Sequence, residues 1–358
     1  MKTITEALTF DDIQIVPKYS NILSRSSIDT STRFTKNTKM NIPLVSSPMD
    51  TITEEVMAVI MRNFGGVGII HRFCTIQRQC DMVEYVVSNT DKNSSIPIAA
   101  AVGATGDYLE RAVALYEAGA NVILIDVAHG HHLNVRNAVL SIKGHAIGNH
   151  VDVIAGAVAT HLGALDLCEW GVDAVRVGVG GGSLCETRIR TGVGVPQVTA
   201  LLDCIEATDE YDIPVMADGG IKTPGCVAKA IALGAESVWI GSLFSGTKET
   251  PGPFQKVGEW PNEQLFKPYR GSSSLSQKMS LGEIGESPYP TGKNVEGNST
   301  LVPFKGKAER IINDILDGLR SSMSYVGTTN LLEFRANADI IRITNAGMTE
   351  ARPHLLLK

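Results

Sequence analysis

The sequence predicts a protein of the α/β class that folds as a (β/α)8 TIM barrel. Apolar runs of strand length recur along the chain, with helical segments between most of them, and this order of elements is typical of parallel α/β folds. The runs are continuously apolar rather than alternating, as expected of strands buried on both faces. Eight such runs occur at nearly equal spacing, which favours the barrel over a doubly wound open sheet.

Each predicted strand ends in glycine, a small residue or a polar group. The strands are expected at 42–48, 66–71, 96–103, 121–130, 151–160, 174–182, 213–220 and 237–246. The stretches EAGANVILIDV, EWGVDAVRVGV and ALGAESVWIGS repeat one pattern of helix end, glycine, short turn and buried strand. Glycine at that place ends a helix in the left-handed conformation, so the repeat supports the alternation of helices and strands.

The segments between and after the strands complete the prediction. Residues 106–119 form a predicted amphipathic helix whose apolar face holds Leu109, Ala112, Val113 and Tyr116. Residues 260–306 are rich in Gly, Ser and Pro and are expected to form a long mobile flap after the eighth strand. A last helix is expected at 307–327, with Ile311, Ile315, Leu316 and Leu319 at helical spacing.

Length and composition limit the class of protein. The 358 residues suit a single barrel domain spanning 1–358 with ample core. The net charge of −6 and the scattered basic residues give no support for binding nucleic acid or an anionic membrane. No apolar stretch is long enough to cross a bilayer and no secretory signal opens the chain, so a cytoplasmic protein with reduced thiols is expected.

One of the six cysteines, Cys185, follows the glycine-rich stretch VGVGGGS at the end of the sixth predicted strand. In a barrel, the loops after the carboxyl ends of the strands carry the chemistry. Successive glycines can direct several backbone N–H groups into one concavity and so favour a thiolate or an anionic ligand. Cys185 is therefore either a covalent nucleophile or a small buried hydrophobe, as most free cysteines are and as we expect of the other five.

Three loops indicate a phosphate site. GGGS (180–183), ADGG (217–220) and GSLF (241–244) follow the sixth, seventh and eighth predicted strands, where barrels often bind phosphate. The candidate ligands are the N–H groups of Gly219, Gly220, Gly241 and Ser242 and the hydroxyls of Ser183 and Ser242. The alternative is that these glycines serve only tight turns.

Carboxylates and histidines lie at other strand ends. Asp126 and Asp218 each end a buried strand, where a carboxylate is costly unless it is paired or used; each either binds ribose hydroxyls or forms a structural salt bridge. His129, His131 and His132 have no matching ligand set elsewhere, so a zinc site is not expected. No GxGxxG follows the first strand, so a Rossmann-type dinucleotide site is not expected.

A series of motifs covers nearly the whole chain. They are LTFDDIQIVPKYS (8–20), IPLVSSPMDTITE (42–54), GGVGIIHR (65–72), GGGSLCETR (180–188), GVGVPQVTA (192–200), ADGGIKTPG (217–225), GSLFSGTKETPG (241–252), YRGSSSL (269–275) and GLRSSMSYVG (318–327). In combination they resemble the successive landmarks of the IMP dehydrogenase/GMP reductase family. That family folds as a (β/α)8 barrel and is usually a tetramer, so the resemblance implies a homotetramer.

The resemblance implies covalent chemistry at Cys185. In IMP dehydrogenase the matching thiol attacks C2 of IMP, hydride leaves to NAD, and water hydrolyses the remaining thioimidate to XMP. In GMP reductase the thiol displaces ammonia from GMP and NADPH delivers hydride. Thr187 matches the catalytic threonine of the family. We expect an NAD-dependent IMP dehydrogenase of guanine nucleotide biosynthesis, with GMP reductase, which would use NADP, as the alternative.

The family's other functional positions map onto this sequence by motif. The phosphate would be held by Ser183, Gly220, Gly241, Ser242 and Tyr269, beside Gly219, and the ribose by Asp218. Ser47 and Met49 would line the nucleotide pocket, and Gly271, Ser272 and Ser273 would contact the base. Glu296 has the spacing of the residue that reads the N1 edge of the purine. Asp126, Gly178 and Gly180 would contact the cofactor, and the carbonyls of Gly180, Gly182 and Cys185 would bind potassium.

The sequence also departs from the family. The regulatory tandem (CBS) module that many dehydrogenases insert after the second helix is missing. The flap region LGEIGESPYP lacks the Arg-Tyr pair that activates water, Ala157 replaces a usual asparagine, and Gly181 replaces a common proline. The missing pair and TGVG (191–194) favour a reductase; the N-terminal motif, YRGSSS and RITNAGMTEARPH favour a dehydrogenase. A third possibility is a purine nucleotide binder without turnover.

Overall fold

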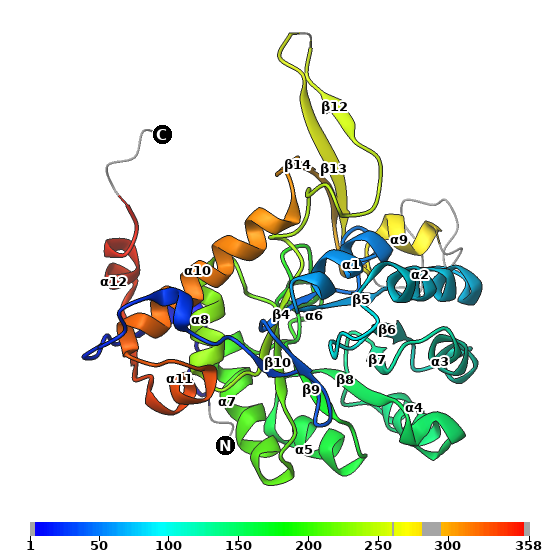
Figure 1. Ribbon diagram of the computed structural model, residues 1–358, viewed down its shortest axis with the longest axis horizontal. Coiled ribbons are helices and arrows are strands. Elements are labelled where there is room, and N and C mark those ends of the chain that lie inside the picture. Colours follow the sequence, from blue (N-terminus) through cyan, green and yellow to red (C-terminus); the bar gives the residue numbers. More distant parts are fainter. Residues whose placement is uncertain (1–3, 260, 281–294, 354–358) are drawn as a thin grey trace.

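The computed structural model describes residues 4–259, 261–280 and 295–353. Parallel strands close into a barrel in the order β10-β11-β4-β5-β6-β7-β8-β9 (Figure 1). Their bounds are β4 (Leu44–Ser46), β5 (Val67–Ile70), β6 (Ala99–Val102), β7 (Val122–Asp126), β8 (Asp152–Val158), β9 (Ala174–Val177), β10 (Val215–Asp218) and β11 (Ser237–Ile240). Each lies within one of the eight predicted runs, so the predicted (β/α)8 barrel is confirmed.

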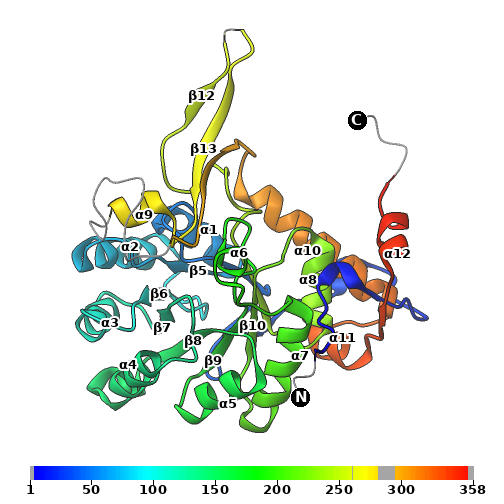
Figure 2. The ribbon, with the colours of Figure 1, turned by 180° about the vertical axis from the view of Figure 1, so that it is seen from behind.

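Helices follow the strands and form the outer ring of the barrel (Figures 1 and 2). They are α1 (Glu55–Asn63), α2 (Ile76–Asn89), α3 (Tyr108–Glu117), α4 (Leu133–Gly144), α5 (His161–Glu169), α7 (Gln197–Thr208), α8 (Pro224–Ala232) and α10 (Ala308–Val326). The glycines of the predicted repeat, Gly119, Gly171 and Gly234, all have positive φ after a helix, as expected of helix ends in the left-handed conformation. No helix in the part of the chain that the structure describes is long and apolar enough to cross a membrane.

The two helices predicted in detail are confirmed as α3 and α10, and the apolar residues predicted on their faces pack in or against the core, although the most buried positions differ in part. In α3, Arg111 and Leu115 are buried with Ala112, whereas Leu109, Val113 and Tyr116 are only half-buried. In α10, Ile312 is buried and its neighbour Ile311 is half-buried. Where two neighbouring residues are both apolar, the sequence does not show which of them faces the core. Packing of the helix against the barrel determines which one is buried.

The core has two layers, one inside the barrel and one between strands and helices. Along each strand, alternate side chains point inward. The inner cluster holds Val45, Val67, Ile69, Ala99, Ala101, Val122, Leu124, Ile154, Ala174, Met216 and Trp239 from the strands. It also includes Phe34 and Met40, from the region of the hairpin β2 (Thr32–Arg33) and β3 (Lys39–Met40). The barrel interior is therefore packed, and ligands must bind at its mouth.

A three-stranded antiparallel sheet follows the last barrel strand and stands out from the barrel (Figures 1 and 2). It consists of β12 (Gln255–Val257), β13 (Gln264–Arg270) and β14 (Ser299–Pro303), and the helix α9 (Leu275–Ser280) follows β13. This sheet occupies part of the predicted flap, 260–306. The central part of that prediction, including LGEIGESPYP, lies outside the described residues, so the flap stays a prediction.

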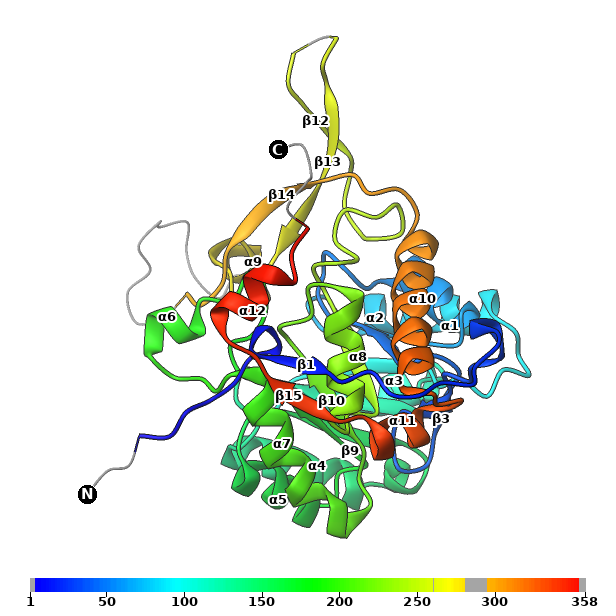
Figure 3. The same ribbon diagram turned by 90° about the vertical axis from the view of Figure 1, so that its left-hand side faces the viewer.

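Strands from near the two ends of the chain pair on one side of the barrel. Figure 3 shows β1 (Ile13–Ile15) beside β15 (Ile340–Arg342), and the two strands pair antiparallel, with Gln14 opposite Ile341. The helices α11 (Leu331–Asn337) and α12 (Asn345–Glu350) flank β15 in the chain. The segment just before β1 also reaches the loop after β10, where a Cβ on Gly220 would lie 3.4 Å from the Phe10 ring.

Candidate active site

The register of three neighbouring strands brings charged side chains together at the mouth of the barrel. Asp126 is opposite Gly156 on β8, Gly156 is opposite Arg176 on β9, and Arg176 is opposite Met216 on β10. Because inward-facing positions alternate, Asp126, Arg176 and Asp218 follow Leu124, Ala174 and Met216 of the inner core. They form the last layer of the barrel interior before the loops begin.

Arg176 is the centre of this layer. Its Nη1 donates to Asp126 Oδ1 at 2.6 Å, its Nε donates to Asp218 Oδ2 at 2.8 Å, and its guanidinium lies over the Trp239 ring at 4.6 Å. Burial acts to lower the pKa of Arg176, but the charges of Asp218 and Asp126 outweigh it and raise that pKa above its usual value. Asp126 and Asp218 therefore form the predicted salt bridges, while both still line the cavity described below.

Cys185 lies in the loop between β9 and the short helix α6 (Thr187–Thr191) and is exposed. The other cysteines are buried, apart from the half-buried Cys74. Burial raises the pKa of Cys74 and Cys168 to about 11 and that of Cys204 to about 12. These thiols stay protonated near neutral pH and behave as small hydrophobes, whereas Cys185 is placed to react.

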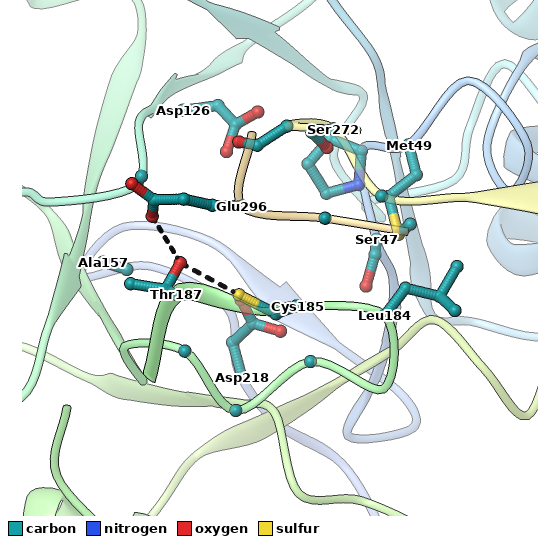
Figure 4. A pocket seen from close by; sticks show the side chains of 18 of the residues that line it. Ser47, Met49, Asp126, Ala157, Leu184, Cys185, Thr187, Asp218, Ser272 and Glu296 are labelled. Carbon is teal, nitrogen blue, oxygen red and sulfur yellow. Dashed lines mark hydrogen bonds between the residues drawn. The ribbon is translucent and has the colours of Figure 1, made fainter. Parts of the chain in front are cut away.

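A short chain of polar groups leads away from the Cys185 sulfur (Figure 4). Sγ of Cys185 donates to Thr187 Oγ1 at 3.2 Å, and Oγ1 of Thr187 donates to Glu296 Oε2 at 2.7 Å. Thr187 and Glu296 are 109 residues apart in the chain. We call Cys185, Thr187 and Glu296 the relay, because a proton can pass from a group near the sulfur to the carboxylate through the threonine hydroxyl.

The predicted phosphate residues converge beside this relay. The Ser183 hydroxyl and the Tyr269 phenol are hydrogen-bonded at 2.9 Å, and burial raises the pKa of Tyr269. A Cβ on Gly241 would lie 3.4 Å from the Tyr269 oxygen and 3.6 Å from the Met49 sulfur and the Ser47 hydroxyl. Only glycine leaves this space open, which suits a ligand that approaches the backbone.

One predicted phosphate ligand, the Gly220 N–H, is engaged within the protein, and contacts at Gly219 and Ser242 fix the neighbouring loops. The Gly220 N–H donates to the Gly181 carbonyl at 3.0 Å, so this N–H is not directed at a phosphate. A Cβ on Gly219 would lie 2.9 Å from the Gly181 carbonyl carbon; glycine is needed there because two loop backbones touch. The Ser242 carbonyl accepts from Lys305 Nζ at 2.8 Å, which fixes the loop after β11.

A cavity of about 210 Å³ joins these groups. The predicted residues that line it are Ser47, Met49, Asp126, Gly178, Gly180, Gly182, Ser183, Cys185, Thr187, Asp218, Tyr269, Gly271, Ser272, Ser273 and Glu296. The predicted residues that are not among its lining are Gly219, Gly220, Gly241 and Ser242. Residues 271–273 and 296 reach the cavity from the ends of the protruding sheet, and 178–187 reach it from the loop after β9.

Sequence reasoning missed several lining residues, of which Arg176 and Arg72 carry charge. A functional role for Arg176 could have been predicted from the sequence, because an arginine within the apolar run AVRVGV is expected to be buried and requires a charged or polar partner. The side chain of Leu184 and the ring of Phe73 also line the cavity, and nothing in their local sequence distinguishes them from core residues.

The histidines of the AHGHH stretch lie outside the cavity that contains the relay. His131 Nε2 is 2.7 Å from Asp166 Oδ2, and His129 and His132 line a neighbouring cavity of about 260 Å³ that shares Arg72 and Val127 with the first. Among the residues that the structure describes, no group of three or more His, Cys, Asp or Glu side chains could hold a metal ion.

Together, the fold and the site define a (β/α)8 barrel with an exposed thiol, an acid–threonine pair and hydroxyl-lined space at its mouth. This is an arrangement for covalent chemistry on a small polar molecule. Comparison with known proteins gives the family. The family model described as "IMP dehydrogenase / GMP reductase domain" matches residues 7–354, and the chain belongs to this family of oxidoreductases that act on purine nucleotides.

Individual relatives cover the chain almost completely. It is 38% identical to the inosine-5'-monophosphate dehydrogenase of Cryptosporidium parvum, over 99% of this chain and 96% of that protein. It is 36% identical to the enzyme of the same name from Borreliella burgdorferi, over 99% and 98%. Among solved structures, a cysteine-to-alanine variant of GMP reductase from Trypanosoma brucei in complex with guanosine 5'-monophosphate has a TM-score of 0.91 and 28% identity, covering 99% of both chains.

Proposed function

We propose that the protein is an NAD-dependent IMP dehydrogenase that oxidises IMP to XMP through a covalent adduct on Cys185. The observation that carries the proposal is the relay, in which an exposed thiol lies 3.2 Å from a threonine hydroxyl that is itself 2.7 Å from a carboxylate. The curated relatives described above carry the name of this activity.

The reaction divides into two steps at one carbon atom. The Cys185 thiolate adds to C2 of the purine, and the C2 hydrogen leaves with its electron pair, so that a thioimidate joins the sulfur to C2. Water then adds to C2, the C–S bond breaks, and XMP and the thiol are released. Glu296 accepts the proton of the attacking water through the Thr187 hydroxyl, which takes the place of the Arg-Tyr pair missing from the sequence.

Nucleotide binding would rest on the groups around the relay. Ser183 and Tyr269, with the backbone of Gly241 and Ser242, would hold the phosphate, while Gly219 and Gly220 would shape the adjoining turn against Gly181. Asp218 would hold the ribose hydroxyls while its carboxylate also accepts from Arg176. The backbone of Gly271, Ser272 and Ser273 would contact the base, whose N1 edge would face Glu296, and Ser47 and Met49 would close the pocket.

The cofactor NAD, when bound, supplies the hydride acceptor. Two adjoining cavities that share Arg72 and Val127 give an elongated space beside Cys185, which suits a molecule longer than the nucleotide. Asp126, Gly178 and Gly180 would hold its nicotinamide half. Ala157 also lines this space.

A potassium ion would be held by the carbonyls of Gly180, Gly182 and Cys185, since backbone carbonyls are suitable ligands for this ion. The Gly182 carbonyl accepts the Cys185 N–H at 3.1 Å and keeps a second lone pair for a cation. A homotetramer, as implied by the resemblance to the family, is proposed as the assembly.

The alternative is GMP reductase, favoured by the similarity to the Trypanosoma brucei enzyme and by the absence of arginine from LGEIGESPYP. One experiment separates the possibilities: the purified protein is incubated with IMP and NAD, or with GMP and NADPH, while absorbance of the reduced nicotinamide is followed. NADH formation supports the dehydrogenase, and NADPH consumption with GMP supports the reductase. Silence in both assays leaves a purine nucleotide binder without turnover and overturns the proposal.

A further inference from the structure

The loop that carries Cys185 is paired with a segment more than a hundred residues later in the chain. Cys185 is opposite Gly297 in an antiparallel bridge. On either side of this pair, the Glu186 N–H donates to the Glu296 carbonyl at 2.7 Å and the Asn298 N–H donates to the Leu184 carbonyl at 2.9 Å. The reactive cysteine is thus the central residue of a short strand pair.

The same segment is held on its other side by residues 271–274. Gly297 is opposite Ser274 in a parallel bridge, and the Gly271 N–H donates to the Asn298 carbonyl at 2.9 Å. Residues 296–298 therefore lie between the cysteine loop and the loop predicted to contact the base. A Cβ on Gly297 would lie 3.2 Å from the Ser274 nitrogen, so glycine allows the three segments to pack closely.

One side chain adds a second link across this pairing. Glu186 Oε1 accepts from Asn298 Nδ2 at 2.8 Å, and Glu186 Oε2 accepts from Arg190 Nε at 2.9 Å. The hydrogen bonds from Arg190 and Asn298 lower the pKa of the Glu186 carboxyl, so it is ionised at neutral pH. Glu186 is not among the residues that line the cavity; its carboxylate joins the two segments from outside the site.

We propose that Glu186 is a positioning residue, whose hydrogen bond to Asn298 holds Glu296 in register with Thr187. The inference rests on the proposed function, because it assigns Glu186 a part in the step that uses the relay. Glu186 lies between Cys185 and Thr187 in the chain, and Asn298 lies two residues beyond Glu296, so the side-chain bond ties together the two backbones that carry the relay.

The physical reason is the precision that proton transfer requires. The Glu296 carboxylate accepts from Thr187 at 2.7 Å, and a displacement on the order of 1 Å in such a group can cost about 100-fold in rate. Loss of the Glu186–Asn298 bond leaves residues 296–298 tied to the cysteine loop by the backbone pairs and by the Thr187–Glu296 bond that must be positioned. In the proposed mechanism Glu296 takes up a proton only in hydrolysis, whereas its contact with the N1 edge is one of several nucleotide contacts, so the later step should slow most.

The test compares four variants with the wild-type protein. Glu186→Ala and Asn298→Ala each remove the link, and we expect each to lower kcat about tenfold while kcat/KM for the nucleotide changes little, because the steps up to the adduct are unaffected. Glu186→Gln keeps an acceptor oxygen for Asn298 and should restore most of kcat. Arg190→Met is the matched control, since it removes the other partner of the same carboxylate and leaves the Asn298 bond intact; it should keep the wild-type rate.

Two further readouts separate positioning from a structural role. The first turnover should stay fast in Glu186→Ala, with the Cys185 adduct accumulating in mass spectra, because only hydrolysis is slowed. The double variant Glu186→Ala/Asn298→Ala should be no slower than either single variant, since both remove the same bond.

The outcomes are distinct. Wild-type rates in Glu186→Ala, additive losses in the double variant, or loss of the first turnover together with kcat would each overturn the positioning role while the proposed function stands. A wild-type protein that does not turn over IMP would overturn the proposed function itself, and the inference with it.

Discussion

The cavity has a floor and a rim that are built differently. The floor consists of Asp126, Arg176 and Asp218, which project from the ends of barrel strands and in which one arginine pairs with both carboxylates. The rim is the relay of Cys185, Thr187 and Glu296, which belong to loops and meet only because two distant segments pair. The floor is fixed by strand register, whereas the rim is fixed by a few hydrogen bonds.

Because of this difference, substitutions in the floor and in the rim should differ in their effect on the free energy of unfolding. Charges in the floor are largely withdrawn from water and share one cation, so removal of Arg176 takes the ion-pair partner from Asp218 and leaves Asp126 with Arg72 at 4.0 Å. Groups in the rim are exposed or half-buried, so their removal costs little folding free energy. We therefore expect substitutions in the rim to affect turnover and substitutions in the floor to affect stability as well.

The largest effect on turnover is expected for Cys185→Ser in the rim. The variant should retain nucleotide binding, because the predicted phosphate contacts do not involve the sulfur, but it should lose turnover by at least about 10³-fold. Binding is measured by calorimetry, and the covalent adduct by mass spectrometry of protein incubated with nucleotide and cofactor. An adduct in Cys185→Ser would contradict the assignment of this thiol.

The largest effect on stability is expected for Arg176→Met in the floor. The substitution leaves Asp126 and Asp218 without their shared cation, and we expect the free energy of unfolding to fall by about 3–5 kcal/mol, as measured by urea denaturation. Arg190→Met is the matched control, because the Arg190–Glu186 pair is at the surface, with the arginine side chain 53% exposed; such pairs contribute about 0–1 kcal/mol. Equal losses in the two variants would remove the distinction between floor and rim.

The barrel can be predicted from the sequence because each of its strands and helix ends is marked by a pattern of neighbouring residues. Each barrel strand is a continuous apolar run, and glycines such as Gly119 and Gly171 mark the helix ends between them. The finer features are less predictable: the face of α3 depends on how the helix packs against its neighbours.

The site is predictable in part, for the same reason. Asp126, Asp218 and Cys185 are found from their places at strand ends, and Thr187 and Glu296 from the resemblance to the family. Arg176 was missed although its burial follows from its strand. The bond between Glu186 and Asn298 joins residues 112 apart, and no local pattern in the sequence indicates such a pairing.

The smallest effect is expected for Thr187→Ala, which tests whether the rim works as a connected relay. Removal of the hydroxyl interrupts the path to Glu296 but leaves the sulfur and the predicted nucleotide contacts in place, so hydrolysis should slow about 10- to 100-fold while the first turnover stays fast. Thr187→Ser keeps the hydroxyl and should retain most of the rate, which separates loss of the hydrogen bond from loss of packing. If the steady-state rate of Thr187→Ala equals that of the wild type, the proton leaves by another route, and the contact between Thr187 and Glu296 serves only to hold the loop.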